Sequence, residues 1–183
     1  VVDDGSEIPF VNPCKALDVR VITLPRKAVA KSPLAGWNAG VAAARGEIVV
    51  LSCVEVIHEA PILSELASHV REIGPKGYVL AAAWCPEEGA WHCHSTVQPP
   101  FNPPGTGIGF CAALHKSLYL EAGGFDPEYR DGAGYEDCDW INRLLRAGAR
   151  FVHRDDLKVI HPKTGASIAW GAERFERNLE LFR

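Results

Sequence analysis

Three acidic side chains stand close together in the sequence, where Glu136, Asp137 and Asp139 follow Gly134-Tyr135. A carboxylate can accept the proton of an attacking hydroxyl group as a general base, and a second carboxylate can orient that hydroxyl. Acids in the first turn of a helix also interact favourably with the helix dipole and cap its free N–H groups. The residue types alone therefore allow either base catalysis or a capped helix start with solvated carboxylates.

A second group of chemically active side chains occupies residues 91–94. Imidazole and thiolate groups bind zinc, so one hypothesis is a zinc hydrolase that uses His92, Cys93 and His94. No second cluster has zinc-like spacing, however, and neighbouring residues of an extended chain face opposite ways. Gly105–Gly109 lacks the G-x-G-x-x-G spacing of a dinucleotide site, and no G-x-x-x-x-G-K-[ST] phosphate loop occurs. The spacing argues against each of these sites.

The segment from Cys85 to Gly107 contains Pro86, Pro99, Pro100, Pro103 and Pro104, which is too much proline for regular structure. We expect a long functional loop there. Three aromatic side chains in or beside it, Trp84, Trp91 and Phe101, have faces that can stack on a sugar ring, although ordinary packing explains them equally well.

The elements that position these residues follow from the spacing of apolar residues. We expect strands at residues 1–2, 19–24, 48–51, 78–84 and 108–114, and a last strand within residues 151–160. We expect helices at residues 34–45, 61–74, 115–122, 135–147 and 172–183, most of them ended by glycine. The run at residues 48–51 is apolar throughout, which is typical of a central strand buried on both faces. This alternation predicts one α/β layered domain over residues 1–183 with a mostly parallel sheet.

Composition limits the class of protein. The 183 residues are 47% hydrophobic and 23% charged, and the net charge of −4 provides no basic field for nucleic acid. No apolar run approaches the roughly 20 residues of a transmembrane helix, so we expect no transmembrane segment. Six cysteines, Cys14 among them, form no C-x-x-C pair, which favours reduced thiols and a cytoplasmic location. The chain has no methionine and begins at the end of a strand, so we expect that an N-terminal piece is missing.

The last predicted helix is amphipathic, with Phe175, Leu179 and Phe182 on one face. Packing against the body of the domain is one interpretation. Attachment to a membrane surface or to a partner is the other.

Two segments together carry a family resemblance. Gly123-Gly124-Phe125-Asp126 and Glu136-Asp137-Cys138-Asp139 resemble the paired G-G-F-D and E-D-x-D elements of family 2 glycosyltransferases and of related galactosyltransferases. Other family elements match in order along nearly the whole chain: the D-D-G-S turn at residues 3–6, N-x-G with A-x-G-E at residues 38–47, the acceptor-side strand after Gly107-Ile108-Gly109, and a late strand ending in His161. The resemblance implies a GT-A fold, a Rossmann-like α/β/α arrangement that here lacks its first strand.

The resemblance also implies an activity: inverting transfer of a hexose from a nucleotide-diphosphate sugar, most simply a UDP-sugar, to a hydroxyl of a glycan or other acceptor, as in polysaccharide biosynthesis. Asp137 would be the catalytic base, with Glu136 orienting the acceptor. Glu55 and His161 would hold Mn²⁺ or Mg²⁺. The remaining family positions would contribute to binding: for the nucleotide Asp3, Asp4, Ser6, Asn38 and Cys53, and for the acceptor Gly107 and Gly109. Trp84 is a further acceptor-binding candidate, because its ring could stack on a sugar.

One departure from the family pattern concerns the metal. Where the family has D-x-D, this chain has Cys53-Val54-Glu55. A neutral thiol is soft and carries no charge for a hard cation, so a weakened metal site is expected. The alternative is a catalytically impaired relative that binds a nucleotide or a glycan.

Overall fold

The computed structural model describes residues 1–12, 18–25, 32–99, 101–163 and 171–183. Cys14 and Pro100, both considered above, lie outside the described residues. The five cysteines within the described ranges are free thiols. None of the helices in these ranges is long and apolar enough to cross a membrane.

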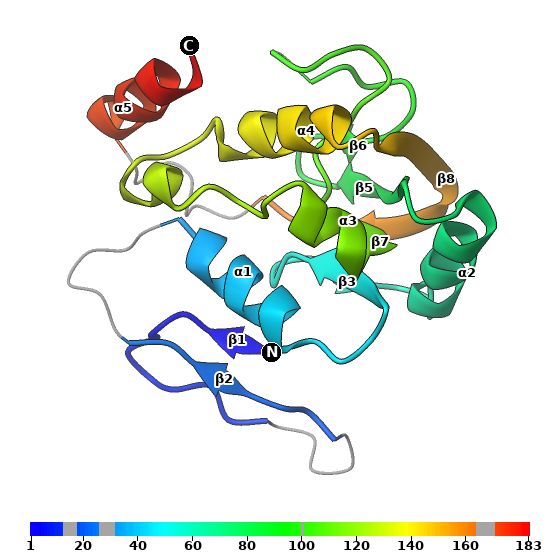
Figure 1. Ribbon diagram of the computed structural model, residues 1–183, viewed down its shortest axis with the longest axis horizontal. Helices are drawn as coiled ribbons and strands as arrows, with labels where there is room; N and C mark the ends of the chain where they lie inside the picture. Colours follow the sequence, from blue (N-terminus) through cyan, green and yellow to red (C-terminus); the bar gives the residue numbers. More distant parts are fainter. Residues whose placement is uncertain (13–17, 26–31, 100, 164–170) are drawn as a thin grey trace.

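The strands form two sheets (Figure 1). The small sheet pairs two short parallel strands, β1 (Val2–Asp3) and β2 (Ile22–Thr23). The large sheet has the order β3-β7-β5-β8-β4, with β6 beside β5. Its strands are β3 (Ile48–Ser52), β4 (Ile57–His58), β5 (Gly77–Cys85), β6 (Ala90–Cys93), β7 (Cys111–His115) and β8 (Arg150–Ile160).

The α/β class predicted from the sequence is confirmed, but the expectation of a mostly parallel sheet is wrong. Only β5 and β8 pair in parallel in the described part of the large sheet, while β7 runs antiparallel to both β3 and β5. Parallel neighbours need a crossover, usually a helix. The segment between β5 and β7 instead forms the antiparallel strand β6 and an irregular stretch, and the chain returns in the opposite direction. Strand β6 also corrects the expectation of an irregular segment throughout residues 85–107.

Strand β3 corrects a second expectation. It lies at the end of the strand order, and its residues alternate, with Val49 and Leu51 buried and the others partly exposed. A continuous apolar run therefore did not mean a central strand here. The periodicity of apolar residues cannot distinguish a central strand from a strand at the end of a sheet, because another element can cover the second face of an end strand.

The helices agree with the predicted segments. They are α1 (Leu34–Ala43), α2 (Leu63–Ile73), α3 (Lys116–Glu121), α4 (Glu136–Arg146) and α5 (Ala172–Phe182), with a 3₁₀ helix, η1 (Pro127–Asp131), before α4. Gly74 follows α2 at φ 91° and Gly148 follows α4 at φ 80°, a backbone region that favours glycine.

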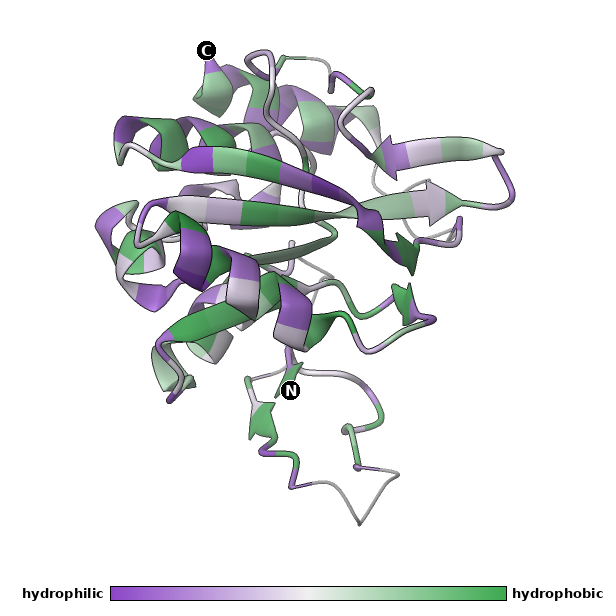
Figure 2. Ribbon diagram, turned by 90° about the vertical axis from the view of Figure 1, so that its right-hand side faces the viewer, coloured by the Kyte–Doolittle hydropathy of each residue, from purple (hydrophilic) through white to green (hydrophobic). Residues whose placement is uncertain are grey.

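The core lies on the large sheet, and its centre is β5. Residues 78–83 of this strand are at most 2% exposed, and α2 packs on β3, β5 and β7 through Leu66 and Val70. Figure 2 shows the long strands, with their hydrophobic stretches, between helices.

The C-terminal helix α5 packs on η1 and the start of α4. Asn178 is buried and donates hydrogen bonds to the carbonyl oxygens of Tyr129 and Gly134, while Phe182 stacks on Tyr135 with ring centroids 5.7 Å apart. These contacts support the interpretation that this amphipathic helix packs on the domain.

Candidate active site

A cavity of about 170 Å³ lies between the start of α1, the end of β3, the segment before β7 and the start of α4. Its walls are largely aromatic and aliphatic, and they include Trp37, Tyr78 and Trp140. Its carboxyl and thiol groups come from Cys53, Glu55, Glu136 and Asp137. The fold thus brings the acidic pair and the Cys53-Val54-Glu55 segment to one cavity, although they are about eighty residues apart in the sequence.

The acidic pair begins α4 after two residues in the left-handed backbone region, Gly134 at φ 68° and Tyr135 at φ 65°. A non-glycine residue is uncommon there and carries strain. The ring of Tyr135 is held between Phe101 and Phe182, each with its centroid 5.7 Å away. Packing therefore holds the backbone bend that starts the helix at Glu136, at the edge of the cavity.

Burial perturbs both carboxyl groups. Desolvation raises the pKa of Asp137 to about 7, and the neighbouring Glu136 carboxylate adds to the rise. Burial also raises the pKa of Glu136, against the opposing effect of hydrogen bonds such as the one from Ser32 Oγ to Glu136 Oε1 at 3.4 Å. The other oxygen, Oε2, is buried and has no hydrogen-bond partner among the described residues. A bound hydroxyl group could supply that missing donor.

The Cys53-Val54-Glu55 segment follows directly after β3. The backbone N–H of Cys53 donates to Phe110 O at 2.9 Å and ties the strand end to the segment before β7. Burial, followed by the charges of Glu55 and Asp137, raises the pKa of the Cys53 thiol to about 12. The thiol is therefore neutral at physiological pH.

Glu55 and His161 lie together, with Glu55 Oε1 3.7 Å from His161 Nε2. The His161 backbone N–H donates to Trp84 O, and the imidazole lies against Phe110 with centroids 4.2 Å apart. Burial is the main cause that lowers the pKa of His161, with His92 contributing. The ring is thus kept neutral, as a metal ligand must be.

Gly107 and Gly109 line the same cavity. A Cβ on Gly107 would lie 2.7 Å from His153 Cε1, and one on Gly109 would lie 2.6 Å from Tyr78 Oη. Close packing therefore requires glycine at both positions. Their assignment to acceptor binding stays a prediction.

Five of the predicted nucleotide and acceptor residues lie outside the lining of the cavity, namely Asp3, Asp4, Ser6, Asn38 and Trp84. The Asp3 carboxylate accepts the N–H groups of Ser6 at 2.8 Å and Phe10 at 2.9 Å, and these bonds lower its pKa. These hydrogen bonds from nearby backbone groups stabilise the D-D-G-S turn. Asp4 adjoins α1, where its Cβ lies near Gly36, and Trp84 packs edge-on against Trp91 at 5.0 Å.

Asn38 has a structural role that the sequence did not indicate. Its carboxamide donates to Phe125 O at 2.8 Å, accepts from Phe125 N at 3.1 Å and accepts from Tyr119 Oη at 2.5 Å. It thereby holds the G-G-F-D segment, whose Phe125 lines the cavity. Sequence reasoning also missed Trp140 and Ile141 as lining residues. Each stands one helical turn after an acid of the pair, a spacing that identifies the same helix face.

The proposed zinc ligands His92, Cys93 and His94 do not converge. Cys93 is buried, His94 stacks on Trp91 with centroids 4.7 Å apart, and His92 faces Glu88 and His161. The ladder between β5 and β6 shifts register at His92, Cys93 pairs with Ala83, and His94 lies just beyond the end of β6.

No protein-family model matches the sequence, and no curated protein matches it. Solved glycosyltransferase structures are similar to it in fold. One is the mannosyltransferase PcManGT from Pyrobaculum calidifontis in complex with GDP-Man and Mn²⁺, with 17% identity over 88% of this chain and 46% of that chain, and a TM-score of 0.55. Another is GalNAc-T7 with UDP, GalNAc and Mn²⁺, with 11% identity over 87% of this chain and 36% of that chain, and a TM-score of 0.61.

A third is the catalytic domain of Drosophila β1,4-galactosyltransferase 7 in complex with xylobiose, with 12% identity over 89% of this chain and 65% of that chain, and a TM-score of 0.56. The chain therefore spans less than two thirds of each of these structures. The likeness shows that the chain has the GT-A fold that its motifs predicted.

Proposed function

We propose that this chain is the catalytic core of a glycosyltransferase that moves a hexose from a nucleotide-diphosphate sugar to an acceptor hydroxyl group. The observation that carries the proposal is that Glu136 and Asp137 line the same cavity as Cys53 and Glu55. The fold is that of structures solved with GDP-Man, UDP and Mn²⁺. In this proposal the carboxylate pair supplies the proton acceptor, and Cys53-Val54-Glu55 is a remnant of the family's metal motif at the same cavity.

The reaction that we propose is an inverting displacement. The acceptor hydroxyl loses its proton to the Asp137 carboxylate as its oxygen bonds to the anomeric carbon, and the nucleoside diphosphate leaves with the electron pair of the broken bond. A pKa of about 7 makes Asp137 a stronger base than an ordinary aspartate, while about half of it is still ionised at neutral pH. Glu136 Oε2 accepts a second hydrogen bond from the acceptor and orients it.

Glu55 and His161 are suited to hold the divalent cation of such a reaction. Their nearest atoms, Glu55 Oε1 and His161 Nε2, lie 3.7 Å apart, which is too long for a hydrogen bond, and both could face one cation. Carboxylate oxygen and imidazole nitrogen together suit manganese better than magnesium, which prefers oxygen alone. A bound cation would neutralise charge on the leaving diphosphate. The neutral Cys53 thiol adds little to this site, so we propose that metal binds mainly together with nucleotide.

A panel of nucleotide-sugars, UDP-sugars first and GDP-mannose beside them, tests the proposal with and without sugar acceptors. The measurement is acceptor-dependent release of nucleoside diphosphate. Asp137→Asn should lower turnover by about 10² to 10⁴ while nucleotide binding persists. Asp139→Asn is the matched control, because Asp139 stands on the same helix but pairs with Arg143 at 2.5 Å. Normal turnover in Asp137→Asn would exclude the assigned base.

A second candidate is a protein that binds a nucleotide or glycan without transfer, and the neutral thiol at Cys53 favours it. Tight nucleotide binding with no turnover on any donor and acceptor of the panel would support this candidate.

A further inference from the structure

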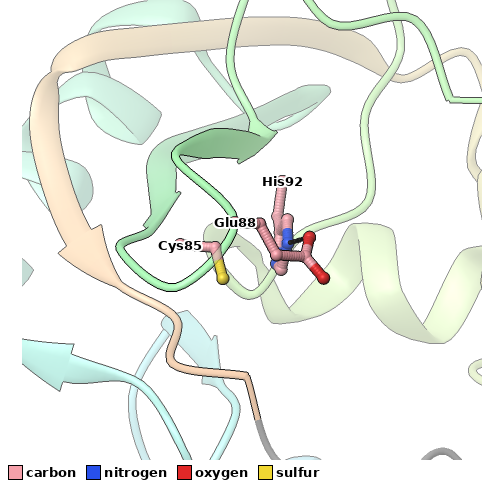
Figure 3. A group of neighbouring side chains, drawn as sticks. All are labelled: Cys85, Glu88 and His92. Carbon is pink, nitrogen blue, oxygen red and sulfur yellow. Dashed lines mark hydrogen bonds and ion pairs between the residues drawn. The ribbon is translucent and has the colours of Figure 1, made fainter.

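Three side chains converge on the hairpin between β5 and β6, beside the cavity rather than in its lining. Cys85 ends β5, Glu88 stands in the turn, and His92 stands in β6 (Figure 3). Figure 3 shows the imidazole of His92 facing the carboxylate of Glu88, with His92 Nε2 2.9 Å from Glu88 Oε2. The other ring nitrogen, Nδ1, lies 2.7 Å from Nδ1 of His161.

A β-bulge places His92 in this position. Trp84 pairs with Trp91, but the next pair along the ladder is Ala83 with Cys93, so His92 is the extra residue on β6. A bulge interrupts the ladder and changes the direction of a side chain, and bulges often stand next to active sites. The sequence alone could not show this, since it placed residues 91–94 in an irregular loop.

The contacts form a line from the surface to the proposed metal site. Glu88 contacts His92, His92 contacts His161, and His161 lies 3.7 Å from Glu55 at the cavity. Glu88, at the surface end of this line, also forms an ion pair, because Lys163 Nζ lies 3.0 Å from its other oxygen. This ion pair helps to keep Glu88 ionised, and it lowers the pKa of that carboxyl together with the larger effect of the His92 hydrogen bond.

The charge of Glu88 determines which ring nitrogens of His92 and His161 carry a hydrogen. An ionised Glu88 only accepts hydrogen bonds, so His92 Nε2 must carry a hydrogen. If that hydrogen is the only one on the His92 ring, Nδ1 carries none and can only accept a hydrogen bond. His161 Nδ1 must then be the donor of the 2.7 Å contact. The remaining nitrogen, His161 Nε2, keeps its lone pair and faces Glu55.

We propose that His92 and Glu88 are positioning residues, which fix the tautomer of His161 so that its Nε2 atom is ready to bind the divalent cation. The proposal rests on the metal site proposed above. In many metal sites a carboxylate orients a metal-binding histidine directly. Here a second histidine, His92, stands between the carboxylate of Glu88 and the metal-binding His161. It also gives a reason why a motif with only one acid could still hold a cation: one remaining nitrogen ligand is held in the required tautomer and orientation.

The same three side chains offer a different possibility, since their potential ligand atoms lie within 4.8 Å of one another and include sulfur, nitrogen and oxygen, a set that suits zinc. Zinc on His92 Nε2 would move the hydrogen of His92 to Nδ1. His161 Nδ1 would then have to accept it, and His161 Nε2 would lose its lone pair. Zinc binding and the proposed role of His92 therefore exclude one another.

Nuclear magnetic resonance of protein with ¹⁵N-labelled histidine provides the direct test, because the nitrogen shifts report which ring nitrogen carries hydrogen. The expected result is hydrogen on Nε2 of His92 and on Nδ1 of His161. Hydrogen on Nε2 of His161 would overturn the proposal. So would stoichiometric zinc uptake that disappears in Cys85→Ser.

Manganese titration in the presence of UDP provides the functional test, read as affinity by calorimetry and not as activity. His92→Phe removes the acceptor and should weaken manganese binding about 10- to 100-fold. His92→Gln keeps a carbonyl acceptor and should restore most of the affinity. His94→Phe is the matched control, because His94 lies just after the end of the same strand and, among the described residues, makes no hydrogen bond to Glu88 or His161. This variant should bind manganese as the unchanged protein does, with melting curves recorded for all variants.

Two failures can be told apart. If Glu55→Gln and His161→Gln lose manganese affinity but His92→Phe does not, the positioning role is wrong and the metal site stands. If Glu55→Gln and His161→Gln also bind manganese as the unchanged protein does, the proposed metal site is wrong, and the role of His92 and Glu88 with it.

Discussion

Replacing Asp137 by asparagine should stabilise the folded protein at high pH, in addition to impairing turnover. Burial raises the pKa of Asp137 from an ordinary 3.8 to about 7, so the folded state holds the proton more tightly than the unfolded state does. A raised folded-state pKa contributes stability that is fully present below about pH 4 and is lost as the pH rises through about 7. Above that pH the protein carries an ionised, desolvated carboxylate. Asparagine keeps the shape without the charge.

The magnitude follows from the difference between 3.8 and about 7. At about 1.4 kcal/mol for each pH unit, ionised Asp137 costs the folded state on the order of 4 kcal/mol, an upper value because water can relax around the charge. The variant should therefore gain up to about that much free energy of unfolding over the unchanged protein between about pH 4 and about pH 9.

Urea denaturation of both proteins across this pH range measures the difference, and the effects of all other titrating groups cancel in the comparison. Asp139→Asn is the control, and it should have the opposite sign because it breaks the ion pair with Arg143. A pH-independent difference between Asp137→Asn and the unchanged protein would refute the reasoning, since the carboxylate would then not be desolvated. Turnover of the unchanged protein should rise with pH through about 7, as the base loses its proton.

Three further predictions concern other parts of the site. Cys53→Asp should strengthen manganese-dependent nucleotide binding in calorimetry, because it restores an oxygen ligand beside Glu55; unchanged binding would mean that Cys53 does not stand at the metal. Asn38→Ala should lower the free energy of unfolding by about 2 to 4 kcal/mol in urea denaturation, because Phe125 loses both backbone hydrogen bonds to the carboxamide; a stability within error of the unchanged protein would contradict this. Asp4→Ala should weaken UDP binding in calorimetry and leave acceptor binding unchanged, as the family resemblance implies, and equal UDP affinity would remove Asp4 from the nucleotide site.

Local sequence determined the helices and the residue types of the acidic pair. Gly74 and Gly148 ended their helices as predicted, because a left-handed residue at a helix end is a local requirement that glycine meets. The E-D-x-D segment likewise began a helix where its spacing predicted one. The bend before this helix, by contrast, is held by the rings of Phe101 and Phe182, which come from distant parts of the chain.

The strand order and the partners of single side chains were decided only by the tertiary structure. The direction of β7 and the end position of β3 depend on pairing between strands far apart in the chain, which apolar periodicity does not encode. Asn38 binds Phe125 across 87 positions of the chain, and His92 meets His161 across 69. Residue types and spacing determined which groups could do chemistry. Only the packed sheet, which brings distant segments together, decided that Asn38 holds a backbone segment and that His92 faces His161.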